Sequence, residues 1–438
     1  MHYLPNILFA IALAIGFGFF AMNVRKLFRN IRLGKDINRT DNKSARLKNM
    51  LKIAFGQSKM VRRPISGLLH LVVYVGFIII NIEVLEIVID GLFGTHRLFQ
   101  DILGTNFYGI LIGTFEVLAV LVLVAVFVFW TRRNVVKIKR FLSAEMKGWP
   151  KNDGNFILYF EVVLMTLFLT MNATDAPFQE AGVGNVISQF IAPIFDGFSV
   201  ETLHTIERTA WWFHILGILV FLNYLYYSKH LHILLAFPNT YFANLNPKGQ
   251  FTNLEAVTKE VKLMMDPSVD PYATPTENTE NQIPEKFGAS DVADLSWVQL
   301  LNAYTCTECG RCTSSCPANL TGKKLSPRKI MMDTRDRLEE VGKNIDANGG
   351  VFKDDGKQLL NDYITPEELW ACTSCNACVE ECPVNIDPLS IIVDMRRYLV
   401  MEQSAAPQSL NMMMTNIENN GAPWQYNQQD RLNWVNEE

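Results

Sequence analysis

The eight cysteines of this chain fall into two copies of one spaced run. In each copy two residues separate the first three cysteines, and three residues separate the third from a fourth that precedes proline. The copies are Cys306, Cys309, Cys312 and Cys316, followed by Cys372, Cys375, Cys378 and Cys382. This run is typical of two [4Fe–4S] clusters, in which the fourth cysteine of each run binds the other cluster. The pattern predicts one cluster on Cys306, Cys309, Cys312 and Cys382, and another on Cys372, Cys375, Cys378 and Cys316.

Zinc is the alternative, because cysteine pairs with two residues between them also bind that metal. Zinc needs only four thiolates in a site, and it gives no reason for a third spaced cysteine and a Cys-Pro in each run. We therefore expect clusters. All eight cysteines are then used and none is left for a disulfide, which indicates a reducing compartment for this part of the chain.

Four histidines are a second candidate group, because they stand within or beside long apolar runs: His70, His214, His230 and His232. An imidazole inside a membrane span is costly unless it is paired, so such a residue is a functional candidate. Two facing histidines suit the axial positions of a b-type haem, which needs no cysteine attachment. The alternative is a hydrogen bond between helices. We expect His70 and His232 to be the axial pair.

Five stretches are long and apolar enough to span a bilayer, at about 20 residues per crossing. They lie near residues 4–24, 65–90, 107–130, 156–173 and 209–236. His70 and His232 fall near the same end of the second and fifth spans, so we expect them at similar depth. His214 lies eighteen residues before His232, or about 27 Å along a continuous helix, and cannot share that iron. His230 is expected to face elsewhere on the same helix.

Charge between the spans sets the expected orientation. Residues 25–63 carry thirteen Lys and Arg and residues 131–153 are also basic, whereas residues 174–208 are mainly acidic. The positive-inside rule then places the basic loops and the polar half, residues 240–438, in the cytoplasm and the N-terminus outside. We expect a multi-pass protein of the inner (cytoplasmic) membrane, with the lipid bilayer as a partner. Nucleic acid is not expected as a partner, because the basic residues cluster beside the apolar runs.

The polar half predicts an α-helical ferredoxin type of domain, because 55 residues separate the two cysteine runs. Its helices should begin at capping signals: near Ser290 or Asp291, at Ser326-Pro327, at Thr365-Pro366 with Glu368, and at Asp387-Pro388. The expected fold class is all-α, with a five-helix transmembrane haem-binding bundle followed by a ferredoxin domain with two clusters. The expected boundaries are 1–238 for the bundle, 239–288 for a linker, 289–402 for the ferredoxin domain and 403–438 for a tail.

The fifth apolar run, HILGILVFLNYLYYSKHLHILLAFP at 214–238, resembles the last transmembrane helix of the gamma subunit of respiratory nitrate reductase. The related membrane subunits of heterodisulfide reductase are similar. In that family the last helix supplies haem ligands eighteen residues apart, as at His214 and His232, and the second helix supplies two that are ten residues apart. Here His70 matches one of the second pair, but Ile80 occupies the other position. The resemblance implies one haem, and leaves a second haem or a quinone site open at His214, Glu83 and Glu86.

The cysteine runs, CTECGRCTSSCPA and WACTSCNACVEECPVNI with GKKLSPRK between them, resemble the small iron–sulfur subunit of heterodisulfide reductase. ENNGAPWQYNQQDRLNW at 418–434 resembles the segment that leads to a cysteine-rich catalytic domain in longer members, and no cysteine follows it here. Trp424, Tyr426 and Trp434 are aromatic residues that a disordered end seldom carries. We expect this tail to dock a separate cytoplasmic subunit that carries the cysteine-rich domain.

The sequence therefore predicts a membrane-bound electron-transfer subunit. It would pass electrons between the quinone pool, a b-type haem, two [4Fe–4S] clusters and the cysteine-rich oxidoreductase partner, on which substrate is converted. Two alternatives are a membrane-anchored iron–sulfur redox sensor and a zinc-stabilised scaffold, both without quinone turnover. Metal analysis separates iron from zinc, and haem content with quinone turnover separates electron transfer from sensing.

Overall fold

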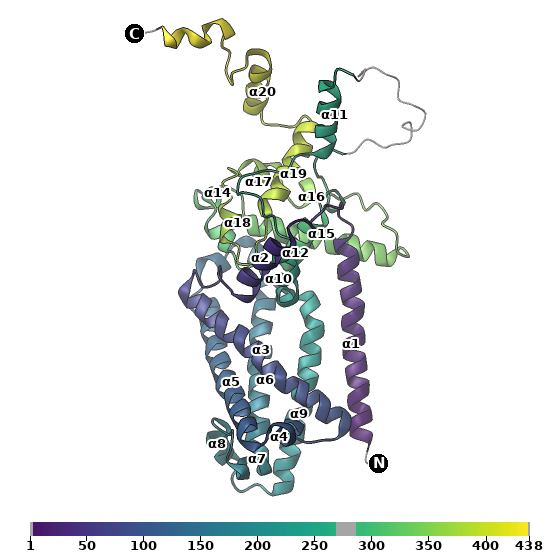
Figure 1. The fold of residues 1–438 in the computed structure, drawn as a ribbon, viewed down its shortest axis with the longest axis vertical. Helices are drawn as coiled ribbons and strands as arrows, with labels where there is room; N and C mark the ends of the chain where they lie inside the picture. Colours follow the sequence, from purple (N-terminus) through teal and green to yellow (C-terminus); the bar gives the residue numbers. More distant parts are fainter. Residues whose placement is uncertain (1–2, 269–285, 437–438) are drawn as a thin grey trace.

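The computed structural model describes residues 3–268 and 286–436 of the 438-residue chain, and this part is built from helices (Figure 1). Its β contacts are isolated bridges, one between Lys35 and Ser296 and one between Leu360 and Ile364. The expected all-α fold is confirmed for the described residues.

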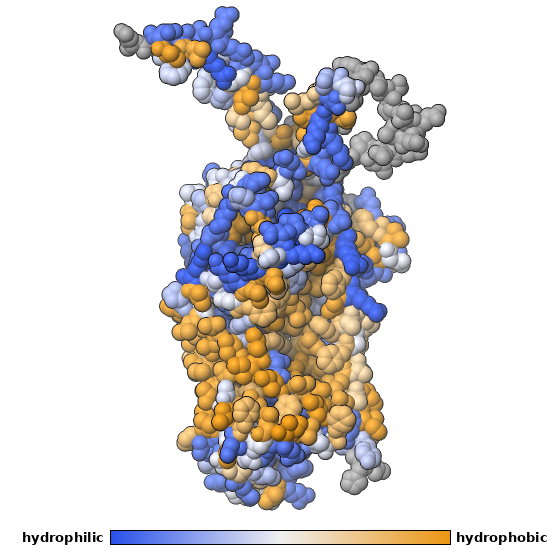
Figure 2. Space-filling view, viewed as in Figure 1, coloured by the Kyte–Doolittle hydropathy of each residue, from blue (hydrophilic) through white to orange (hydrophobic). Residues whose placement is uncertain are grey.

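Five of the described helices are long and apolar enough to cross a membrane, as expected of a membrane protein. They are α1 (Leu4–Ile31), α3 (Pro64–Phe93), α5 (Thr105–Asn134), α6 (Trp149–Thr174) and α9 (Val200–Tyr224). Contacts run from α1 to α3, α5, α6 and α9 and back to α1, so the five helices close into a ring. Their outer surfaces form the apolar belt that Figure 2 shows between two polar ends.

The fifth span ends earlier than the expected run of 209–236. Helix α9 ends at Tyr224 and is followed by 3-10 turns at Leu225–Tyr227 and Lys229–Leu231, with extended backbone at Ser228 between them. A new helix, α10 (His232–Tyr241), then begins. The Asp153 carboxylate holds this break, because it accepts hydrogen bonds from the Tyr224 hydroxyl at 2.6 Å and the Lys229 backbone N–H at 3.1 Å. His232 therefore opens a separate helix.

Short elements cover both ends of the bundle. At the end away from the cysteines lie α4 (Leu98–Leu103), α7 (Ala176–Ala181) and α8 (Ser188–Ile191). A 3-10 turn follows at Ala192–Phe195. At the other end lie α2 (Lys43–Met50), a π-helical turn at Leu51–Phe55, and 3-10 turns at Lys139–Phe141 and Ala144–Met146. Helix α11 (Glu255–Met265) falls in the expected linker of 239–288, of which residues 269–285 lie outside the described residues.

The cysteine domain (residues 286–402) sits on one end of the bundle (Figure 1). Its helices are α12 (Trp297–Thr305), α13 (Arg311–Ser314), α14 (Pro317–Leu320), α15 (Pro327–Ala347), α16 (Leu359–Asp362), α17 (Pro366–Trp370), α18 (Ala377–Glu381) and α19 (Pro388–Met401). Three of them begin at the predicted caps: Ser326, Thr365 with Glu368, and Asp387. The helix expected from Ser290 or Asp291 begins later. Asp291 caps a 3-10 turn at Val292–Asp294, and α12 begins after Ser296.

One hydrophobic core joins the cysteine domain to the bundle. Leu27 and Ile31 of α1 are buried in the same core as Leu300 of α12, and Leu235 of α10 belongs to it as well. The boundary expected at 238 thus falls inside α10, a helix that packs against the cysteine domain. This shared core fixes the position of the cysteines relative to the membrane helices.

The C-terminal segment projects away from this body (Figure 1). It contains α20 (Gln408–Asn420) and a 3-10 turn at Gln428–Val435, neither of which has a buried residue. Trp424 and Trp434 are 61% and 71% exposed.

Candidate redox centres

Both cysteine runs form the same kind of loop. Glu308 and Gly310 in the first run have positive φ angles of 53° and 69°, and the equivalent Ser374 and Asn376 in the second run have 57° and 60°. Left-handed backbone at these positions turns the chain tightly around its first three cysteines. Backbone N–H groups then reach the sulfur atoms, as from Ser374 to Cys372 at 3.4 Å. Such N–H donors stabilise bound thiolates and tune a cluster.

The fourth cysteine of each run lies with the first three of the other run. One cavity is lined by Cys316, Cys372, Cys375 and Cys378, together with apolar residues that include Leu389 and Ile392. In the other set the Cys312 thiol is close enough to Cys309, Cys306 and Cys382 for their charges to interact. The structure therefore brings together two sets of four thiols with crossed membership.

These sets suit a cluster in chemistry as well as in number. Within the described ranges no three cysteine, histidine or carboxylate side chains surround one single-ion position. A cubane instead takes one thiolate at each of four irons, so its ligands stand further apart. Burial raises the pKa of Cys306 to about 12 and that of Cys382 to about 11, so iron must displace protons when it binds the apo chain.

Basic side chains from the membrane bundle surround the first thiol set. Lys59 lies beside Cys382, and Arg140 lies beside Cys309. Arg311, inside the first cysteine run, donates hydrogen bonds to the carbonyl oxygens of Lys59 at 3.1 Å and Met60 at 3.2 Å. Sequence reasoning assigned no role to these residues. The available signal was an arginine in the motif GRC opposite a basic loop.

A buried ion-pair network ties the first cysteine loop to the end of the bundle. The Glu308 carboxylate, 3% exposed, pairs with Lys229 at 2.5 Å and with Arg335 at 2.8 Å. Lys229 is itself 9% exposed and also donates to the Pro150 carbonyl oxygen at 2.6 Å. Burial alone would raise the pKa of Glu308, but Lys229 and Arg335 hold that pKa below its ordinary value. This network was not foreseen from the sequence.

His70 and His232 face each other at the same end of the bundle. Their ring centroids are 6.5 Å apart, and the ring planes differ by 38°. An iron held at about 2 Å by one nitrogen of each ring would set the centroids about 6 Å apart. The Nδ1 of His232 donates to the Lys229 carbonyl oxygen at 3.0 Å, which leaves Nε2 unprotonated. The Nδ1 of His70 is buried and has no partner among the described residues. The pair fits two axial ligands of one metal.

His230 lies in the same group, contrary to the expectation that it faces elsewhere on one helix. It stands in the 3-10 turn before α10, with its ring centroid 5.4 Å from that of His232. The break at Ser228 is the physical reason, because it removes the helical periodicity that would separate the two side chains. Arg311 is close enough to His70 for their charges to interact, so the first cysteine loop lies next to this histidine group.

His214, Glu83 and Glu86 are not joined by hydrogen bonds in the described structure. The Nδ1 of His214 lies 3.0 Å from the Leu164 carbonyl oxygen. Glu86 accepts from the Phe99 N–H and from the Tyr108 hydroxyl, both at 2.9 Å. Glu83 is 3% exposed, and its Oε2 is buried without a partner among the described residues. Glu83 is thus the unsatisfied member of this set.

The fold and these centres define a membrane protein with an iron–sulfur dicluster domain. The model of the family described as 4Fe-4S dicluster domain matches residues 305–386. Over 98% of its length the chain is 29% identical to the "Probable iron-sulfur-binding oxidoreductase FadF" of Bacillus subtilis (strain 168), of which it covers 61%. It is 27% identical over 92% of its length to the "EtfAB:quinone oxidoreductase" of Syntrophomonas wolfei subsp. wolfei, of which it covers 55%.

A third relative matches a shorter part of the chain. Over 108 residues, 25% of this chain, the identity is 32% to one of the proteins that make up the "Ferredoxin:CoB-CoM heterodisulfide reductase" of Methanosarcina mazei, and 53% of that relative is covered. This match confirms the resemblance to heterodisulfide reductase that the cysteine runs indicated. The chain spans 55% to 61% of the length of the two oxidoreductases. No solved structure matches it at a significant level.

Proposed function

We propose that this chain passes electrons between quinone in the membrane and a cysteine-rich oxidoreductase unit that meets the cysteine domain. A b-type haem on His70 and His232 and two [4Fe–4S] clusters would supply one-electron chemistry when bound. The observation that carries the proposal is the order of the centres. The histidine pair lies at the bundle end, the first thiol set lies next to it through Arg311, and the second set reaches the surface at the exposed Cys375.

The chain's own residues would hold these centres in a fixed relation. Lys229 and Glu308 link the first cysteine loop to the turn that carries the histidines. Helix α18, which follows the second loop, is held on the segment before α3 by ion pairs of Arg62 with Glu380 at 2.6 Å and Arg63 with Glu381 at 2.9 Å. Rigid support of this kind keeps the spacing between electron carriers constant.

Quinone enters the proposal from two directions. The name of the relative EtfAB:quinone oxidoreductase states a quinone reaction for that protein. In this chain the unpartnered carboxyl oxygen of Glu83, with Glu86 nearby, offers a group that could exchange a proton with quinone inside the membrane. His214 with these glutamates remains the alternative position for a second haem. The proposed orientation places the cysteine domain and the basic loops in the cytoplasm and the N-terminus outside the inner membrane.

The proposed partner is a cysteine-rich oxidoreductase unit of the heterodisulfide reductase kind. The match of the cysteine domain to part of a heterodisulfide reductase supports this choice. The docking element would be the tail, in which Trp424, Tyr426 and Trp434 are exposed aromatic side chains. Such residues supply large contact area at low entropic cost when they are buried at an interface.

Anaerobic reduction by duroquinol tests the proposal. The purified holoprotein should show a reduced b-type absorption band together with the paramagnetic signals of reduced clusters. His70→Ala should abolish cluster reduction by duroquinol but not by dithionite, whereas Thr114→Ala, on the outer surface of α5, should behave as wild type. Full cluster reduction by duroquinol in His70→Ala would contradict the proposed path.

A further inference from the structure

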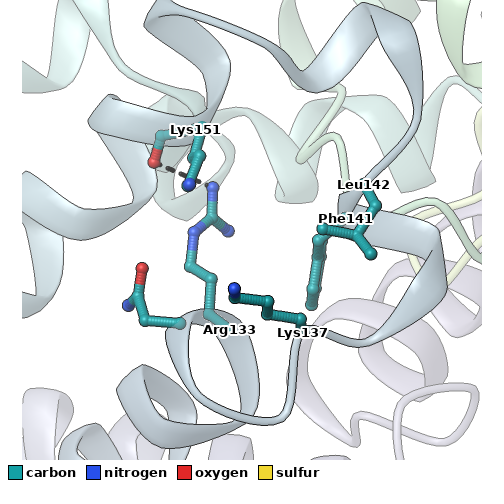
Figure 3. A pocket seen from close by; sticks show the side chains of 6 residues that line it. Arg133, Lys137, Phe141, Leu142 and Lys151 are labelled. Carbon is teal, nitrogen blue, oxygen red and sulfur yellow. Dashed lines mark hydrogen bonds between the residues drawn. The ribbon is translucent and has the colours of Figure 1, made fainter.

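A cavity of about 190 Å³ opens where α5 ends and α6 begins, at the cysteine-domain end of the bundle (Figure 3). Its lining residues are Arg133, Asn134, Lys137, Phe141, Leu142 and Lys151. None of them belongs to the thiol sets or to the histidine group, so the proposed electron path does not use this cavity.

Three of the lining residues are cations. Figure 3 shows Arg133 in the middle of the cavity, with Lys137 and Lys151 beside it. The Arg133 guanidinium donates to the carbonyl oxygens of Pro150 at 3.1 Å and Lys151 at 3.0 Å, and its Nε is buried without a partner among the described residues. Among residues 3–268 and 286–436 no carboxylate forms an ion pair with any of the three. The cavity therefore holds excess positive charge and a free N–H donor.

The Arg133 guanidinium is fixed in place. A Cβ added at Gly154 would lie 2.6 Å from its Cζ, so a glycine is needed for the arginine to rest on α6. On another side the guanidinium lies over the Phe141 ring, 5.2 Å from its centroid. A guanidinium held in this way presents planar donors that match a phosphate group.

The surroundings of the cavity are those of a membrane interface. Val135 and Val136 are 63% and 64% exposed beside Arg133, and Trp149 at the start of α6 is 51% exposed. Aromatic and basic residues in this arrangement mark the headgroup level of a bilayer. A free phosphate ion would need no apolar rim, whereas a phospholipid would place its acyl chains there.

We propose that this cavity binds the phosphate headgroup of an anionic phospholipid. Basic pockets between transmembrane helices on the cytoplasmic side bind such headgroups. The occupant would also brace the cysteine domain, because the same interhelical loop contacts it. Glu145 pairs at 2.7 Å with Arg328, which is fully buried, and Arg328 also donates to the Arg140 carbonyl oxygen at 2.7 Å.

Lipid binding and thermal stability of the full-length holoprotein test this proposal. Delipidated protein is titrated with phosphatidylglycerol, with zwitterionic phosphatidylcholine and with inorganic phosphate, and bound phospholipid is counted by native mass spectrometry. The test variant is Lys137→Gln with Lys151→Gln. The matched control is Lys48→Gln with Lys52→Gln, which removes the same charge from exposed positions near the same end of the bundle. Gly154→Ala tests the seat of Arg133 separately.

Phosphatidylglycerol should raise the melting temperature of wild type and control and remain bound at one site. The test variant should bind it about 30-fold more weakly, which corresponds to about 1 kcal/mol for each lost cation. Gly154→Ala should also weaken binding. Equal binding by test and control variants would overturn the proposal. An equal effect of phosphatidylcholine would do so too, and equal stabilisation by inorganic phosphate alone would overturn the lipid assignment.

Discussion

Lys229 and Glu308 form an ion pair of 2.5 Å between residues 79 positions apart, one in the turn after α9 and the other inside the first cysteine loop. The same lysine accepts a hydrogen bond from His232 Nδ1 through its carbonyl oxygen, at 3.0 Å. One residue therefore touches both the proposed haem ligand and the loop of the first thiol set. The two proposed centres are mechanically joined at this point.

Replacing Glu308 by alanine should destabilise the holoprotein by about 3–5 kcal/mol, because it leaves the buried Lys229 and Arg335 charges without their partner. The first cluster should be lost before the second, since Glu308 shapes the loop between Cys306 and Cys309. Thermal unfolding and cluster paramagnetic resonance measure both effects. The control is Asp336→Asn, which removes the 56% exposed partner of Arg335 and should change little. Equal behaviour of the two variants would show that the network is dispensable.

The stability of the cysteine domain should fall as the pH rises toward 7. Burial raises the pKa of Asp333 to about 7 from its ordinary 3.8, even though Lys329 lies 2.6 Å away. The folded chain keeps this proton after the unfolded chain has released it, so the stabilisation is complete below 3.8 and is lost as the pH rises through about 7. Melting temperatures between about pH 5.5 and 8 should decline less for Asp333→Asn than for wild type. Asp354→Asn, at an exposed carboxylate, should keep the wild-type slope.

Local signals predicted the helices of the cysteine domain well. Ser326, Thr365 with Glu368, and Asp387 are caps whose partners lie within a few residues, so the sequence contains the whole interaction. The five apolar runs predicted the membrane helices for the same reason, because length and hydropathy are properties of one segment.

Long-range contacts decided the rest. The break after Tyr224 depends on Asp153, 71 positions away, and no Pro or Gly marks it in the sequence. The same is true of the Lys229–Glu308 pair, whose partners belong to different parts of the chain. Sequence spacing could therefore place His70 and His232 near the same end of the bundle, but could not reveal that His230 joins them.

Cys316→Ser should damage the cluster of the second run and spare the first. Cys316 lines the cavity with Cys372, Cys375 and Cys378, although it belongs to the first run. Wild-type protein should contain about eight non-haem irons, from two cubanes. The variant should retain the paramagnetic signal that is lost in Cys306→Ser. Loss of the same signal in both variants would contradict crossed ligation, and zinc in place of iron would contradict cluster binding.

The histidine pair carries the most exposed prediction. The ring centroids of His70 and His232 are 6.5 Å apart, and His232 Nδ1 is committed to the Lys229 carbonyl oxygen. One iron between the two Nε2 atoms would give a low-spin b-type spectrum with one haem per chain. His70→Ala or His232→Ala should abolish this spectrum. His214→Ala should retain it, because His214 is bound to Leu164, and His230→Ala should retain most of it. Pyridine haemochrome analysis counts the haem in each variant. If His214→Ala lowered a count of two to one, a second haem would occupy the bundle, and an unchanged spectrum in all four variants would exclude these histidines as ligands.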